Sequence, residues 1–156
     1  MSYAGTGFDT AFYNDGYDLS TALPVSLSQA NGKGSFGKFA ITITTEWALP
    51  AGLVNCAPDT GEFEFPLISS EAVITFKDQS QLFGIATGGY ICVDTAGENQ
   101  GYYHGQVEGD YVGGTGRFES ATGTYTSPFE GQNLGDPGVG FRSITGTVEG
   151  TVNRSK

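Results

Sequence analysis

Residues 36–48 read FGKFAITITTEWA, and this stretch carries the clearest strand signal in the chain. Large or β-branched residues recur at every second position, namely Phe39, Ile41, Ile43, Thr45 and Trp47. The positions between them are mostly polar or charged. Because successive side chains of a strand point to opposite faces of a sheet, this alternation predicts a strand with one buried face and one solvated face.

Similar segments lie on both sides of this strand, separated by short stretches typical of turns. The turn signals are NGKG at 31–34, KDQS at 77–80, Gly88-Gly89 and AGENQG at 96–101. Together with 36–48, the predicted strands cover 22–30, 63–76, 81–87, 90–95, 102–112, 122–129 and 141–152. Many short strands at regular spacing are typical of an all-β sandwich or barrel.

Glycines at alternate positions favour the barrel over the sandwich. The pattern G-x-V-x-G occurs at 105–109 and again at 146–150, on the face predicted to point inward. Inward glycines fit places where strands coil sharply and leave no room for a side chain. The apolar parity of 63–76 also shifts, which predicts a β-bulge near Pro66 or Ser69. We therefore expect a single eight-stranded antiparallel closed barrel.

The length of 156 residues suits one domain. The first residues are rich in Gly, Asp, Asn and Tyr without a clear period. We interpret residues 1–21 as an extended N-terminal arm that covers the barrel, and residues 22–156 as the barrel domain.

The composition excludes some partners. The formal net charge is −10, and Lys and Arg together number only 7, so the clustered cations that nucleic-acid binding requires are absent from the sequence. No run approaches the roughly 18 apolar residues of a membrane helix, so we expect no membrane insertion. No signal peptide is visible at the N-terminus. A secreted or periplasmic location is slightly favoured over a cytoplasmic one by the Gly- and Thr-rich, basic-poor composition.

The two cysteines, Cys56 and Cys92, allow two interpretations. A disulfide between them would close a loop of about 36 residues and contribute about 3–4 kcal/mol in the chain-entropy model. The alternative is a pair of buried free thiols, and we place the disulfide slightly ahead. One histidine and no CxxC pair predict no metal site and no cofactor. Acidic loops at 14–18, 59–62 and 94–99 leave calcium binding open, although none has EF-hand spacing.

The segment GGTGRFESATG at 113–123 carries a family resemblance, together with GKGSFGKFAITITTEW, ITFKDQSQLFG and the closing ITGTVEGTV. The chain resembles the allene-oxide-cyclase-like and dirigent-like barrel group, and is most similar to small bacterial barrel proteins of unassigned function with a GGTGRF-x-x-ATG turn. The resemblance covers about residues 22–152. It implies a mostly apolar cavity that acts on reactive small molecules, but no catalytic residue can be transferred from it. In this turn we expect Phe118 to plug one barrel end and Arg117 to pair with a carboxylate outside.

The candidate site residues fall into two groups. Arg142 shares the inward parity of Ile144 and Val148, so it could hold a ligand carboxylate or stabilise an oxyanion, with Glu46 or Glu71 as a buried carboxyl. The alternative for Arg142 is an ion pair with an acidic loop. Seven aromatic residues could line an apolar cavity or simply fill the core: Phe39, Trp47, Phe65, Phe83, Tyr103, Tyr111 and Tyr125. His104 lies on the polar parity of its strand, which favours a solvated histidine over a general base.

Three functions remain open at this point, and the resemblance favours the first of them over the second. The first is a cofactor-independent cyclase or isomerase that works by confining a hydrophobic or aromatic small molecule. The second is a noncatalytic protein that binds a lipid or another small molecule. The third is a structural, self-assembling protein that uses its N-terminal arm to form a homo-oligomer. An interior void of about 300 Å³ or more would favour a ligand over assembly.

Overall fold

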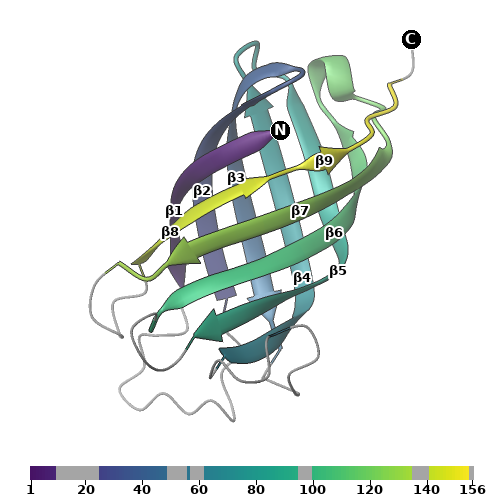
Figure 1. Ribbon diagram of the computed structural model, residues 1–156. Coiled ribbons are helices and arrows are strands. Elements are labelled where there is room, and N and C mark those ends of the chain that lie inside the picture. The colour runs from purple at the N-terminus through teal and green to yellow at the C-terminus, as the bar shows by residue number, and fades with distance from the viewer. Residues whose placement is uncertain (10–24, 49–55, 57–61, 95–99, 135–140, 155–156) are drawn as a thin grey trace.

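Each strand of this chain pairs with the strand that follows it, and the last long strand returns to the first (Figure 1). The computed structural model describes residues 1–9, 25–48, 56, 62–94, 100–134 and 141–154. The strands are β1 Ser2–Asp9, β2 Val25–Gly34, β3 Gly37–Trp47, β4 Glu62–Phe76, β5 Gln81–Asp94, β6 Tyr102–Gly114, β7 Gly123–Gln132, β8 Phe141–Thr147 and β9 Glu149–Gly150. A single short 3-10 helix among the described residues, η2 at Gly116–Phe118, follows β6.

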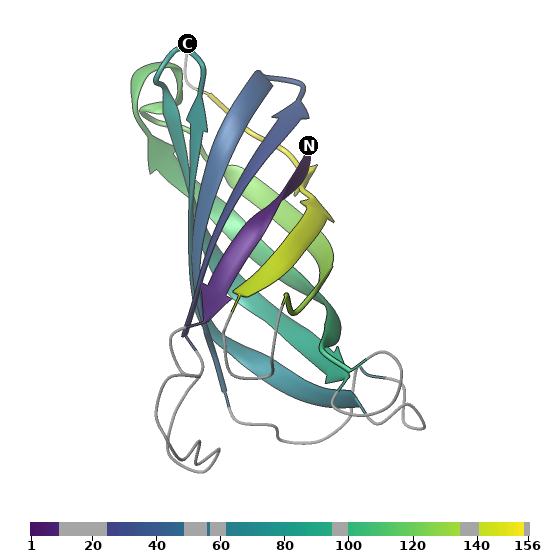
Figure 2. The ribbon, with the colours of Figure 1, turned by 90° about the vertical axis from the view of Figure 1, so that its left-hand side faces the viewer.

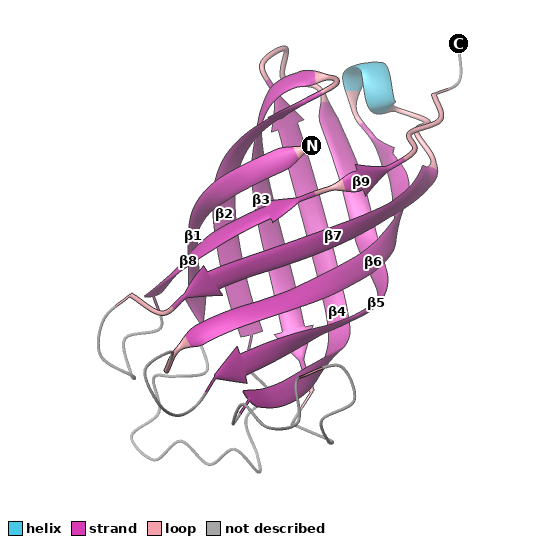
Figure 3. Ribbon diagram, in the orientation of Figure 1, coloured by secondary structure: helices cyan, strands magenta, loops and turns pink. Residues whose placement is uncertain are grey.

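Antiparallel pairing between β1 and β8 closes the barrel. The register runs from Ser2 opposite Thr147 to Phe8 opposite Phe141. With the pairs from β1–β2 through β7–β8, this makes a closed ring of eight strands, and the short β9 adds to β7 (Figures 1 and 3). The predicted eight-stranded antiparallel closed barrel is confirmed.

Two details of the strand assignment differ from the sequence prediction. Residues 2–9, predicted to begin the arm, are extended but form a strand of the barrel wall, because their backbone pairs with β2 and β8 on both sides. The rest of the predicted arm, residues 10–21, lies outside the described residues. The predicted strands 81–87 and 90–95 are one strand, β5, over the described residues Gln81–Asp94. Gly88 and Gly89 pair with Glu108 and Val107 of β6, and a register shift at Thr87 stands where a reversal was expected.

The predicted bulge in β4 lies between Pro66 and Ser69. Glu46 pairs with Ser69 and Trp47 with Leu67, so Ile68 is the extra residue and is 49% exposed. Because of this extra residue, side chains at alternate positions of β4 point into the barrel both before and after the bulge.

Aromatic side chains lie across the inward glycines of neighbouring strands. A Cβ on Gly109 would come within 2.6 Å of the Tyr125 hydroxyl, and one on Gly146 within 2.5 Å of the Tyr3 hydroxyl. The glycines of the G-x-V-x-G patterns therefore make room for large rings from the adjacent strands, which is the close approach that inward glycine allows.

One end of the barrel is closed by an aromatic cluster around η2. Phe118 is 1% exposed and its ring centroid lies 4.9 Å from that of Phe76 and 5.5 Å from that of Phe36. Arg117 covers the cluster from outside, with its guanidinium 4.8 Å from the centroid of Phe76 and its Nε 3.5 Å from an Asp78 carboxylate oxygen. Both roles predicted for this turn are confirmed.

We predict that Phe118→Ala will lower the free energy of unfolding by about 3–5 kcal/mol. The substitution removes a fully buried ring from the cluster of Phe36, Phe76 and Phe118, which we call the plug. Chemical denaturation measures the change. Val112→Ala, at a residue that is 50% exposed, is the matched control, with an expected change within about 0.5 kcal/mol. A similar loss for both variants would contradict the plug.

Candidate functional site

The barrel interior below this plug contains a cavity of about 60 Å³. Aliphatic side chains form much of its lining: Ile41, Ile43, Ala72, Ile74, Val107, Ile144 and Val148. The aromatic lining comes from Tyr3, Trp47, Tyr103, Tyr111, Tyr125 and Phe129, and the polar lining from Ser28, Thr45, Ser70, Ser127 and Arg142. The cavity is therefore an apolar chamber with a few hydrogen-bonding groups, as small-molecule sites generally are.

The volume limits what the chamber can hold. It is smaller than a cavity of about 150 Å³ that accepts benzene, and far below the roughly 300–1,000 Å³ of drug-sized sites. The volume is also below the roughly 300 Å³ that would favour a ligand over assembly, so the size of the interior does not by itself favour a ligand. The interior as it stands fits only a very compact molecule or ordered water.

Four of the seven predicted aromatic residues line the chamber: Trp47, Tyr103, Tyr111 and Tyr125. Phe39 is buried but packs toward the plug, 6.1 Å from the Phe76 centroid. Phe65 is half-buried against the core and is not part of the lining. Phe83 lies on the outer face, because its neighbours Leu82 and Gly84 are buried toward the inside.

Arg142 points inward as predicted by its parity. It is 7% exposed, lines the chamber, and its guanidinium lies 5.2 Å from the centroid of the Tyr103 ring. The two carboxylates suggested as its partners do not join it. Glu46 and Glu71 pair across the sheet with Ser69 and Thr44, whose side chains belong to the outer face, and Glu71 is exposed. The prediction that either is a buried interior carboxyl is wrong, because both occupy the outward parity of their strands.

Hydrogen bonds hold several polar groups of the lining. The Tyr3 hydroxyl lies 3.2 Å from Ser127 Oγ, and Thr45 Oγ1 lies 3.1 Å from Ser70 Oγ. The Tyr103 hydroxyl donates to the carbonyl oxygen of Ser143. Tyr3, which the prediction of an arm over residues 1–21 places outside the barrel, lies in β1 and lines the chamber. The signal was the spacing Tyr3-x-Gly5-x-Gly7, which matches the inward glycine patterns of the later strands.

The interior tyrosines stay protonated at neutral pH. Burial, with a smaller contribution from Tyr125, raises the pKa of Tyr111 to about 12. Burial also raises the pKa of Tyr125 to about 12, with smaller contributions from Asp110 and Tyr3. The pKa of Tyr3 is raised by burial, which outweighs the opposite effect of its bond to Ser127. These phenols therefore act as neutral hydrogen-bonding groups.

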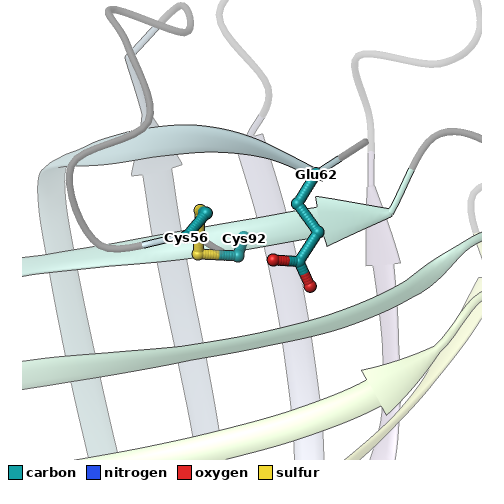
Figure 4. Close-up of side chains that lie close together, drawn as sticks. All are labelled: Cys56, Glu62 and Cys92. Atoms are coloured by element: carbon teal, nitrogen blue, oxygen red, sulfur yellow. A yellow bond between two sulfur atoms is a disulfide. The ribbon is translucent and has the colours of Figure 1, made fainter. Parts of the chain in front are cut away.

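Cys56 and Cys92 are joined in a disulfide, the alternative that the sequence analysis placed slightly ahead (Figure 4). Their Cα atoms are 5.6 Å apart, and both residues are buried. A Glu62 carboxylate oxygen lies within 4.8 Å of both sulfurs, but a disulfide offers no thiolate to a metal.

His104 lies nearby on the outer face, where its Nε2 is 3.1 Å from Glu62 Oε1 and its side chain is 39% exposed. Of the acidic loops considered for calcium, residues 14–18, 59–61 and 95–99 lie outside the described residues. Within the described part of the chain, no helix is long and apolar enough to cross a membrane.

Comparison of this chain with protein-family models, with curated proteins and with solved structures yielded no match. The resemblance of the GGTGRF-x-x-ATG turn to the allene-oxide-cyclase-like and dirigent-like group therefore stays a prediction. The assignment of function depends on the geometry of the barrel.

We predict that Tyr111 and Tyr125 will titrate late in an alkaline absorbance titration at 295 nm, each with a pKa of about 12. Because the unfolded chain ionises near pH 10, their contribution to stability is complete below that pH and is lost as the pH rises toward 12. Tyr125→Phe should remove one late-titrating group. Eight tyrosines with a common midpoint near 10 in the folded protein would contradict this.

Proposed function

We propose that the protein is a noncatalytic binding protein that holds a compact small molecule in the interior of its barrel. The observation that carries this proposal is the apolar chamber inside the barrel, in which Arg142 is the one charged side chain among the described lining residues. Such a site combines apolar surface for affinity with a few polar groups that fix orientation. The resemblance to barrels that receive small molecules supports the same assignment.

Binding is favoured over catalysis by the groups available inside. General acid–base catalysis near neutral pH requires a side chain whose pKa lies close to the working pH. The described lining offers hydroxyls, an indole, an arginine, and phenols such as Tyr111 and Tyr125 with a pKa of about 12. Glu46 and Glu71, the carboxylates suggested for a cyclase or isomerase, lie on the outer face. We therefore place the cyclase or isomerase second.

A ligand would approach from the end opposite η2. The plug of Phe36, Phe76 and Phe118 fills one end of the barrel, where the strands are joined by short turns at 35–36 and 77–80. The C-terminal ends of β1, β3, β5 and β7 lie at the other end (Figure 2).

Filling the chamber provides the test. Ala72 lines the cavity, and Ala72→Leu places a larger side chain there, so we expect at least tenfold weaker ligand retention. Ala40→Leu is the matched control, because Ala40 is exposed on the outer face of β3. Native mass spectrometry of the purified protein measures retained small molecules and the number of subunits together.

Two results would contradict the proposal. An Ala72→Leu variant that retains the same molecule as the unchanged protein would place the ligand outside the chamber. A wild-type barrel that self-associates and retains no small molecule would favour the structural, self-assembling alternative. A retained molecule that is recovered chemically altered would favour the cyclase or isomerase.

A further inference from the structure

The outer face around the disulfide brings together side chains of the types that bind transition metals. The sulfurs of Cys56 and Cys92 and a carboxylate oxygen of Glu62 lie within 4.8 Å of one another (Figure 4). His104 joins this group through its Nε2, which is 3.1 Å from Glu62 Oε1. Thiolate, carboxylate and imidazole are the groups through which proteins bind Zn²⁺.

Strand pairing assembles this group from distant parts of the chain. Cys92 of β5 lies between Glu64 of β4 and His104 of β6. Glu62 is two positions before Glu64 and therefore on the same face of the sheet, from which its long side chain reaches Cys92. Cys56 and Cys92 are 36 residues apart, a spacing that matches no zinc motif. The sequence therefore predicts no metal site here, and the proximity arises from the fold.

The oxidation state of the cysteines decides whether the group can bind a metal. A dithiol reductant supplies two electrons that break the S–S bond, each sulfur takes a proton, and the reductant becomes a disulfide. Binding of Zn²⁺ then releases both protons and leaves two thiolates. Sulfurs close enough to bond each other can both reach an ion about 2.3 Å away after small side-chain rotations.

We infer that reduction of the Cys56–Cys92 disulfide creates a zinc site, in which the two thiolates and the Glu62 carboxylate bind one Zn²⁺. A carboxylate has two oxygens with several lone pairs, so Glu62 can bind the ion and keep its hydrogen bond with His104. His104 is then a positioning residue that orients the carboxylate, as hydrogen-bonding partners of metal ligands do. Water takes the fourth position of the tetrahedron.

The surroundings suit such a site. Both cysteines are buried, and the side chain of Glu62 is only 11% exposed, so the ligands are shielded from solvent. His104 also lines an open groove of about 590 Å³, which provides a route for the ion. This site lies on the outer face of the wall, and the inference goes beyond the binding function proposed for the interior.

Cobalt titration of the reduced, full-length protein tests the inference. The disulfide is reduced with a phosphine, which is removed without admitting oxygen, and Co²⁺ serves as a spectroscopic substitute for Zn²⁺. We expect one equivalent of Co²⁺ to bind with thiolate-to-cobalt charge-transfer absorption in the near ultraviolet, and Zn²⁺ to displace it. The oxidised protein should bind Co²⁺ at least a hundredfold more weakly and without this absorption.

Variants test each assigned contact. The double variant Cys56→Ser with Cys92→Ser should lose the charge-transfer absorption. Glu62→Gln should keep it, because both thiolates remain, but should weaken Zn²⁺ binding at least tenfold. His104→Ala should weaken binding about 10–100-fold, and His104→Gln, which retains a hydrogen-bond donor, should recover most of the affinity. Glu71→Gln is the matched control, since Glu71 is exposed on the outer face of β4 and affinity should not change.

Three results would overturn the inference. The first is equal Co²⁺ affinity of the reduced protein and the double serine variant, which would exclude the thiolates as ligands. The second is unchanged Zn²⁺ affinity of Glu62→Gln, which would exclude the carboxylate. Circular dichroism provides the third: if reduction unfolds the barrel, bound Zn²⁺ should restore the native spectrum, and a failure to do so excludes the site. Retention of a molecule in the chamber is measured separately, so either proposal can fail alone.

Discussion

Antiparallel hydrogen bonding between β1 and β8 joins residues from opposite ends of the sequence, with Tyr3 opposite Gly146 and Gly7 opposite Arg142. This seam makes an inside and an outside, because it leaves no free edge between the first and the eighth strand. It also places two polar side chains in the interior of the barrel: Tyr3 and Arg142 both line the chamber. An open sheet with the same strands would expose both.

Closure alone does not determine the size of the chamber. An eight-stranded barrel can be filled by its own side chains or hold one small ligand, and the choice depends on the inward residues. Here glycines at 109 and 146 admit the rings of Tyr125 and Tyr3 from neighbouring strands. The rings occupy most of the space that the missing side chains would leave. The resulting cavity is small, and this smallness is what restricts the proposed ligand to a compact molecule.

Much of the barrel was predictable from alternation. The inward face of β3 follows directly from Phe39, Ile41, Thr45 and Trp47, all of which are buried. Arg142 was placed inside by the same parity rule. Strand β1 was missed because SYAGTGFD contains one large inward side chain among glycines, so its strand propensity is low and its pairing depends on strands distant in sequence. Gly88-Gly89 predicts a turn, but glycine permits both a reversal and a continued strand, and the sequence does not distinguish them.

The candidate site was less predictable than the fold. Parity places a side chain inside or outside, but it does not say how much space remains around it. Phe39 and Trp47 share a face of β3, yet only Trp47 reaches the chamber, because Phe39 is packed toward the plug. Glu46 was proposed for the interior on chemical grounds even though it alternates with Trp47. The alternation of β3 sets the direction of the Glu46 side chain: because Trp47 points inward, Glu46 points outward.

The disulfide between Cys56 and Cys92 encloses β4 and nearly all of β5, the two longest strands of the barrel. Once it forms, the chain between the cysteines can explore far fewer conformations before it folds, an effect of about 3–4 kcal/mol for a loop of this length. Residues in a covalently closed hairpin also find each other faster than residues at the two ends of the chain. In the oxidised chain, pairing of β4 with β5 therefore costs less conformational entropy than it would without the disulfide.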